Sequence, residues 1–300
     1  MKLLSLALAL AVTPATVAKL SVVATTPDLA AIAREIGGDA VDVKALAKGT
    51  EDPHFVDPKP SHVVTLNRAD VLVEGGAELE LGWLPPLVES ARNDRISASA
   101  RGHVIASQGI QLMEVPTTFD RSKGDVHMLG NPHFLLDPLN ARIVAGNIAA
   151  HLAEVDPKNA TTYAANRKKF EAAVDAKLAE WQQKLARFKG AKIVTYHRDF
   201  VYLGARFGLD IVENLEPKPG IAPSAAHLAR VIETMKSTRA RVILIQPFQN
   251  RKTAENVARQ ADGTVLLMPQ QPGVTPNTDT YIGLMDSIVN SLVSALEGAK

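Results

Sequence analysis

An uninterrupted helical pattern over residues 157–188, in the middle of the chain, constrains the fold more than any other feature. Large apolar side chains recur there every three, four or seven residues, which places them on one helical face: Tyr163, Phe170, Val174, Leu178, Trp181, Leu185 and Phe188. Asp156 can cap the helix and Pro157 suits its first position. At 1.5 Å per residue the helix would be roughly 45 Å long. We therefore predict a spine that joins two lobes.

Short apolar strands alternate with helices on both sides of this spine. Before it, the pattern predicts strands at residues 21–26, 41–45, 71–74 and 104–106 and helices at 27–36, 61–68 and 81–91. After it, strands are predicted at 192–196, 242–245 and 264–268 and helices at 201–207, 224–236, 253–260 and 280–296. Such alternation indicates βα units. The predicted fold is α/β, with two lobes, each a small mostly parallel sheet flanked by helices, joined by one long rigid helix.

The first 18 residues have the order of parts found in a secretory signal peptide. Lys2 supplies the positive charge, residues 3–12 the apolar run and residues 15–18 the small side chains of a cleavage site. The apolar run is too short to span a bilayer. We therefore predict a signal peptide at 1–18, an N-terminal lobe at 19–155, the spine at 156–189 and a C-terminal lobe at 190–300.

The amino-acid composition limits the cellular compartments and the kinds of partner that we expect for this chain. The absence of cysteine excludes disulfides, thiolate catalysis, cysteine zinc sites and the lipidated cysteine of many surface receptors. A formal net charge of +1, from 33 basic and 32 acidic residues, gives no electrostatic case for nucleic acid or an anionic membrane as the main partner. No segment after the signal approaches 18 consecutive apolar residues. We expect a soluble, monomeric periplasmic protein that does not insert into the membrane.

Three of the eight histidines lie in loops. Residues 52–58 read DPHFVDP around His54, and residues 131–138 read NPHFLLDP around His133, so the two segments nearly repeat each other. The proline before each histidine stiffens the backbone that presents the ring. His197 directly follows a predicted strand, at the carboxyl end where open α/β sheets bind ligands.

Three imidazoles satisfy most of a tetrahedral zinc shell, and Asp57 and Asp137 are candidates to orient the first two rings. A lone histidine is more often structural, so the residues alone leave a metal site and ordinary structural histidines both open. We interpret His62, His103, His151 and His227 as structural or surface residues, with His103 in a turn. His127 is a candidate auxiliary ligand.

An ordered set of motifs resembles the zinc/manganese-type solute-binding proteins of ABC importers. The matching stretches are 22–28 (VVATTPD), 52–60 (DPHFVDPKP), 131–138 (NPHFLLDP), 196–200 (YHRDF), 216–224 (EPKPGIAPS) and 242–247 (VILIQP). The resemblance implies two lobes joined by one helix, with a metal held between them by His54, His133 and His197. It also implies delivery of the ion to an ABC permease, with no enzymatic chemistry.

Two positions depart from the family pattern. Met268 occupies a place where an acidic residue commonly supplies a fourth ligand, and Gln246 occupies a place where glutamate is usual. A fourth ligand would then be water or a nearby carboxylate such as Asp279. Manganese-type members tend to have a carboxylate at the position of His197, so the resemblance favours Zn²⁺, with Mn²⁺ possible.

Two other readings stay open at this point. A metal-dependent hydrolase also uses three histidines and an open fourth position, although the sequence has no HExxH motif or nucleophile elbow. A periplasmic metallochaperone or an adhesin would use the same fold without an importer.

Overall fold

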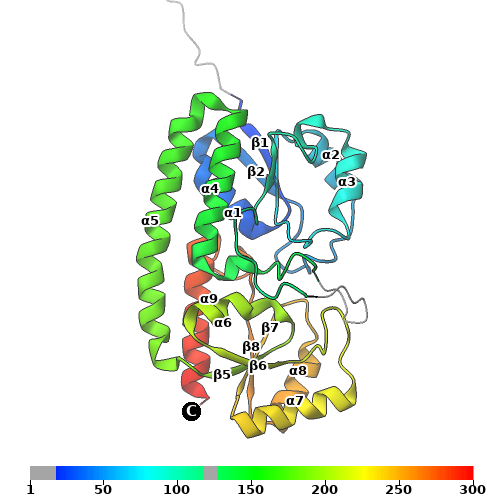
Figure 1. Cartoon of the computed structure of the whole chain (residues 1–300), viewed down its shortest axis with the longest axis vertical. Helices are drawn as coiled ribbons and strands as arrows, with labels where there is room; N and C mark the ends of the chain where they lie inside the picture. The colour runs from blue at the N-terminus through cyan, green and yellow to red at the C-terminus, as the bar shows by residue number, and fades with distance from the viewer. Residues whose placement is uncertain (1–17, 118–126, 300) are drawn as a thin grey trace, which may run out of the picture.

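The computed structural model describes residues 18–117 and 127–299, so the predicted signal peptide lies outside the described residues except for Ala18. Two four-stranded sheets lie one above the other in Figure 1, with helices packed around each. Every strand pair in both sheets is parallel. The predicted α/β fold with two sheets is therefore confirmed. Within the described part of the chain, no helix combines the length and the hydrophobicity needed to cross a bilayer.

The N-terminal sheet has the strand order β2-β1-β3-β4. Its strands are β1 (Leu20–Ala24), β2 (Val41–Ala45), β3 (Val71–Glu74) and β4 (His103–Ile105). Its helices are α1 (Pro27–Gly37), α2 (Pro60–Asn67) and α3 (Leu84–Ala91), all with a proline in the first turn. Proline suits this place because its missing N–H has no partner inside the helix. The helices therefore begin close to where the sequence predicts.

The C-terminal sheet repeats this order as β6-β5-β7-β8. Its strands are β5 (Lys192–Thr195), β6 (Asp210–Asn214), β7 (Val242–Ile245) and β8 (Thr264–Leu267). Its helices are α6 (Val201–Phe207), α7 (Ala225–Thr238), α8 (Arg251–Gln260) and α9 (Tyr281–Gly298). Helix α6 ends at Gly208, whose φ of 73° lies in the left-handed region that favours glycine.

The long helix runs beside both sheets, as expected. Helix α5 (Ala160–Leu185) is 26 residues long and is extended by single 3₁₀ turns at both ends. It packs against α1 and α4 (Pro138–Val155) at one end and against α9 at the other (Figure 1). All seven apolar residues of its predicted face are buried. They join a core that continues from the helices of the first sheet to those of the second. The exact limits of the two lobes stay a prediction.

One local expectation is wrong, and one strand was not predicted. Asp156 makes no capping bond, because its carboxylate accepts hydrogen bonds from Tyr163 Oη (2.8 Å) and Asn159 Nδ2 (2.6 Å) instead. Strand β6 was not predicted from the sequence. Its residues, DIVEN, are mostly half-buried because the strand lies at the edge of its sheet. An edge strand with three polar residues lacks the apolar run that marks the central strands.

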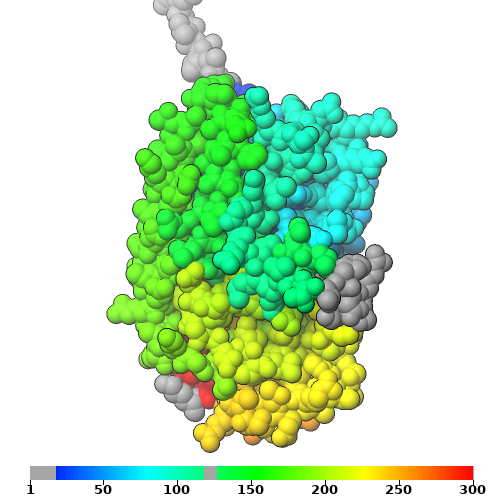
Figure 2. Space-filling view, viewed as in Figure 1, coloured from blue at the N-terminus to red at the C-terminus, as the bar shows by residue number. Residues whose placement is uncertain are grey.

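The topology decides where a ligand site can form. In each sheet the first strand, β1 or β5, lies between the second and third strands of its lobe. The connections that follow the neighbouring strands β1 and β3, or β5 and β7, therefore run to opposite edges of the sheet, and the loops at the carboxyl ends of these strands surround a crevice. The two halves of the molecule meet directly on the face shown in Figure 2.

Candidate metal centre

The structure brings together the rings of His54, His133 and His197. Their centroids lie 5.1 Å (54–133), 5.3 Å (133–197) and 5.5 Å (54–197) apart, close to an equilateral triangle. The planes meet at 63° to 80°, so ring edges rather than faces point inward. One nitrogen from each ring lies within 4.8 Å of the other two. This arrangement can hold a cation of zinc size, and the ligand role of the three rings stays a prediction.

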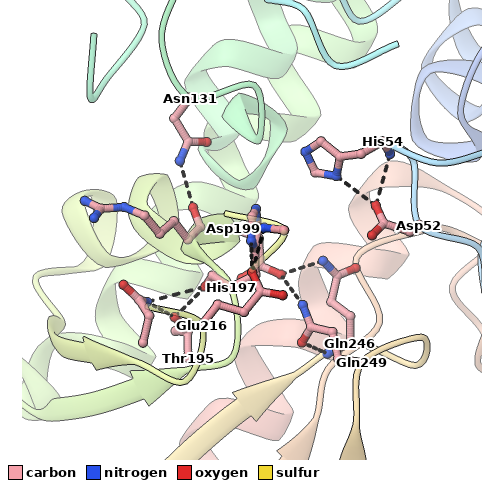
Figure 3. Close-up of polar contacts among 12 residues, drawn as sticks. Asp52, His54, Asn131, Thr195, His197, Asp199, Glu216, Gln246 and Gln249 are labelled. Atoms are coloured by element: carbon pink, nitrogen blue, oxygen red, sulfur yellow. Dashed lines mark hydrogen bonds and ion pairs between the residues drawn. The ribbon is translucent and has the colours of Figure 1, made fainter. Parts of the chain in front are cut away.

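His54 is held by the aspartate two residues before it. Asp52 Oδ1 accepts hydrogen bonds from the backbone N–H of His54 (3.0 Å) and from its ring Nδ1 (2.8 Å). Figure 3 shows both contacts made by one carboxylate. With Nδ1 occupied, Nε2 is left as the free nitrogen, and it is buried without a hydrogen-bond partner in the part of the chain that the structure describes. A carboxylate on the far ring nitrogen fixes the tautomer and makes the imidazole a stronger ligand.

His133 is presented by the same backbone turn. The side chain of Asn131 accepts the backbone N–H of His133 at 3.0 Å, as Asp52 does for His54. Asx side chains commonly stabilise turns in this way. Asn131 Nδ2 in turn donates to Glu114 Oε2 (2.9 Å) and to the carbonyl of Arg198 (2.7 Å). The near-repeat in the sequence is therefore a repeated local structure. In both copies the side chain of the residue before the proline accepts the backbone N–H of the histidine.

The orienting carboxylates predicted from the sequence are wrong. Asp57 is exposed, and no contact joins it to His54. Asp137 caps α4 by accepting the N–H of Leu139 (3.0 Å), and it pairs with Arg206 at 2.6 and 2.7 Å. Those three bonds occupy its carboxylate. Asp52 was in the quoted motif, and its position before the Pro-His pair was the signal that could have identified it.

His197 has its own carboxylate, which the sequence did not indicate. Its Nδ1 lies 2.8 Å from Glu216 Oε2, at the end of β6 (Figure 3). The His197 carbonyl accepts the hydroxyl of the fully buried Thr195 at 2.6 Å, which fixes the backbone after β5. Glu216 lies 19 residues away in the chain and reaches His197 because β6 pairs with β5. Two of the three rings thus have Nδ1 on a carboxylate.

Burial and charge set the protonation of these rings in opposite directions. Burial, and then the neighbouring His54 and His197 rings, hold the pKa of His133 well below its ordinary value. Burial also disfavours charge on His197, but the hydrogen bond to Glu216 and the nearby Asp199 raise its pKa above the ordinary value. His133 therefore offers a neutral imidazole at neutral pH, whereas protons compete with a cation for His197 first as the pH falls.

Asp279, the carboxylate named from the sequence as a candidate fourth ligand, is not part of the cluster, and the two positions that depart from the family pattern, Met268 and Gln246, are buried. Met268 is 1% exposed and belongs to the hydrophobic core. Asp279 is exposed and is outside the group of mutually close ligand atoms found among the described residues. Gln246 is buried and donates from Nε2 to Asp199 Oδ2 at 2.5 Å (Figure 3). Burial raises the pKa of Asp199 to about 6, although His197 and Gln246 oppose the rise.

The remaining histidines divide into one neighbour of the site and four that are not. The ring of His127 stacks on that of His54 at 5.2 Å between centroids. His62 is buried in α2, and His151 contacts the Arg101 carbonyl. The other two are His227, bonded to the Asn214 carbonyl, and His103, which lies on β4, 3.5 Å from Glu74, rather than in a turn.

Bonds between the two halves close the region beside the rings. Tyr202 Oη in α6 donates to the Asn131 carbonyl (2.7 Å) and accepts the Met113 N–H (2.9 Å). Glu114 pairs with Arg198, the residue after the third histidine. His127, His133 and His197 line a cavity of about 440 Å³ next to this pair.

Fold and site together define a class. Two parallel sheets, each with its central strand at a crevice, and three converging imidazoles between them are typical of a protein that binds a ligand between two lobes.

The comparisons with known proteins identify the family. The family described as "Zinc-uptake complex component A periplasmic" matches residues 22–295, so the chain belongs to that family. Its members include substrate-binding proteins of metal ABC transporters, which confirms the resemblance seen in the motifs.

Relatives and solved structures support this assignment. The metal-transporter lipoprotein ScbA of Streptococcus cristatus is 26% identical over 81% of this chain and 77% of its own length. The iron-transporter lipoprotein MtsA of Streptococcus pyogenes serotype M1 is 27% identical over the same shares. A crystal structure of ZnuA is 25% identical, covers 93% of this chain and 99% of its own, and superposes with a TM-score of 0.79. The names of these and other relatives mention iron, manganese or zinc, so membership of the family does not determine which metal this chain binds.

Proposed function

We propose that this protein is an extracytoplasmic receptor that captures a divalent cation, with zinc favoured, on His54, His133 and His197. It then delivers the ion to the membrane subunits of an ABC permease. The observation that carries the proposal is the convergence of three ring nitrogens within 4.8 Å of one another. Two of them, Nε2 of His54 and Nε2 of His133, are buried and have no hydrogen-bond partner among the described residues. A bound cation would satisfy both.

The chemistry of the donor set supports zinc over manganese. Imidazole nitrogen suits zinc, whereas manganese prefers oxygen ligands. The carboxylates near the rings, Asp52 and Glu216, are engaged with Nδ1 atoms and so serve the histidines rather than the ion. Copper and nickel also bind imidazole tightly, so availability of the ion contributes to selection.

The family and the expected signal peptide support periplasmic location and a permease as partner. The role is transport of the ion rather than catalysis, because a receptor must bind its cargo and release it unchanged. In this proposal the site needs a closed coordination shell and no substrate cleft. A hydrolase would need a water-bearing position and a general base beside it.

Titration of the metal-free protein with zinc and with manganese tests the proposal. We expect one tight equivalent of zinc, much weaker binding of manganese, and loss of the tight site in His54→Ala, His133→Ala and His197→Ala. His151→Ala is the matched control, since that ring contacts the Arg101 carbonyl outside the cluster. A triple variant that keeps the tight site would overturn the ligand assignment. Capture of the cognate permease by the zinc-loaded protein tests delivery, and absence of that contact would favour a metallochaperone.

A further inference from the structure

A third buried ring nitrogen in the same region has no hydrogen-bond partner among the described residues. Nε2 of His127 is buried and unbonded, as are Nε2 of His54 and Nε2 of His133. A buried polar atom left without a partner is destabilising, so a group of such atoms in one place indicates a ligand that binds there. The three-histidine site accounts for two of these atoms and leaves the third unexplained.

The ring of His127 is built into the site in the same way as the other rings. It stacks on His54 at a centroid distance of 5.2 Å and an interplanar angle of 28°. A hydrogen bond joins its ring to the backbone of Glu78, which leaves Nε2 as the free nitrogen. One nitrogen held by the protein and the other free is also the arrangement of His54 and His197.

The residues directly after His127 anchor the segment that carries its ring. The Glu78 side chain accepts the N–H of Met128, and Gly130 N–H donates to the His127 carbonyl at 3.2 Å. His127 also lines the cavity of about 440 Å³ together with His133 and His197. Its position beside the ion site is therefore fixed by several contacts.

Among the described residues, the set of mutually close ligand atoms contains the three histidines and no carboxylate that could serve as a fourth ligand. The place of the family's acidic ligand is taken by Met268, which is 1% exposed within the core. Asp199 accepts hydrogen bonds from Gln246 and Gln249 through Oδ2, whereas its Oδ1 is buried without a partner among the described residues. Asp199 is nevertheless outside the set of mutually close ligand atoms, and Asp279 is exposed. His127 is outside the set whose ligand atoms all lie within 4.8 Å, and it faces His54 ring to ring. A turn of its side chain is needed to bring Nε2 to the ion.

We propose that His127 is the fourth nitrogen ligand of the metal-loaded protein and joins the shell when the ion binds. This inference rests on the proposed function. A shell of four imidazoles replaces the acid that Met268 lacks, and it favours zinc over manganese more strongly than three imidazoles do. It also leaves no position for a metal-bound water, the reactive species of a zinc hydrolase.

Nitrogen-detected NMR of the histidine rings in the zinc-loaded protein tests this directly. We expect four rings with a zinc-bound Nε2, and three in the His127→Ala variant. Zinc affinity should fall by at least about tenfold in His127→Ala and His127→Gln, the lower end of what even outer-shell residues contribute. His151→Ala should bind zinc like the wild type.

The outcomes separate this inference from the proposed function. Three zinc-bound rings in the wild type, with unchanged affinity in His127→Ala, would overturn the role of His127 and leave the three-histidine receptor standing. Absence of any zinc-bound ring in the wild type would overturn both. A folded His127→Gln variant with weaker affinity and one fewer bound ring would support the inference even if His127→Ala misfolds.

Discussion

Replacing Glu216 by glutamine should weaken zinc binding although Glu216 does not touch the ion in our proposal. The carboxylate lies 2.8 Å from Nδ1 of His197, so an ion on Nε2 would lie about 7 Å from it across the ring. Glu216→Gln keeps the shape and an oxygen that can still accept the Nδ1–H bond. The substitution therefore removes the negative charge beside His197 and largely keeps the hydrogen-bond geometry.

The size of the effect follows from that distance. A unit negative charge about 7 Å from a divalent cation contributes about 1.2 kcal/mol in bulk water and about 5 kcal/mol at an effective dielectric constant of 20. The Glu216 side chain is 19% exposed, so water screens part of the interaction. Outer-shell partners of ligating histidines typically change metal affinity about 10- to 100-fold, which lies inside these limits. We expect a loss of that size.

The zinc affinities of the wild type and of Glu216→Gln can be measured by competition with a chromophoric chelator at pH 8 and at pH 6. Glu216 raises the pKa of His197, so in the wild type protons compete with zinc as the pH falls through that pKa. In Glu216→Gln the His197 pKa drops and protons compete less. The loss of affinity should therefore be larger at pH 8 than at pH 6.

Glu213→Gln is the matched control, because it removes the same charge from β6 and Glu213 bonds only the neighbouring backbone N–H of Asn214 among the contacts described. Its zinc affinity should stay close to the wild type. Equal losses in the Glu213 and Glu216 variants, or wild-type affinity in Glu216→Gln at pH 8, would refute the reasoning.

Three further variants test other parts of the structure. Burial raises the pKa of Glu80 to about 7, so the folded metal-free protein keeps a proton that the unfolded chain releases above about pH 4.5. Urea unfolding should show stability falling from pH 5 to pH 7.5 by up to about 3 kcal/mol more in the wild type than in Glu80→Gln, and equal slopes would contradict this. Gln246→Glu places a second carboxylate against Asp199 and should lower the free energy of unfolding by about 1–3 kcal/mol, more at pH 8 than at pH 5; no pH dependence would argue against the contact. Trp181→Ala removes a fully buried ring that bonds Asp286 at 2.8 Å and should cost about 3–5 kcal/mol of stability by denaturant titration, whereas a loss below about 1 kcal/mol would mean that α5 and α9 repack without it.

Local patterns in the sequence predicted most of the fold because hydrophobic periodicity carries the information. The apolar face of α5 repeats over 26 residues, β3 and β7 are short runs of branched side chains, and β2 alternates buried valine with exposed polar residues. The edge strand β6 escaped prediction because half-buried polar residues make it a strand only through pairing with β5. Pairing between distant segments leaves no local signal.

The site shows the same division. The loops of His54 and His133 were recognisable because each is a local turn in which an Asx side chain accepts the histidine N–H. The orienting partner of His197 was not, since Glu216 meets it only after the second sheet has formed. The misassigned Asp137 illustrates the reverse error, because Arg206 on α6 takes up its carboxylate from 69 residues away.

A crystal structure of the zinc-soaked protein, with anomalous data collected on both sides of the zinc edge, tests the central claim most directly. We expect one strong zinc peak between the two sheets, about 2.0–2.1 Å from one ring nitrogen of each of His54, His133 and His197. A peak elsewhere, or a zinc ion at this position bound by fewer than three of these rings, would contradict it.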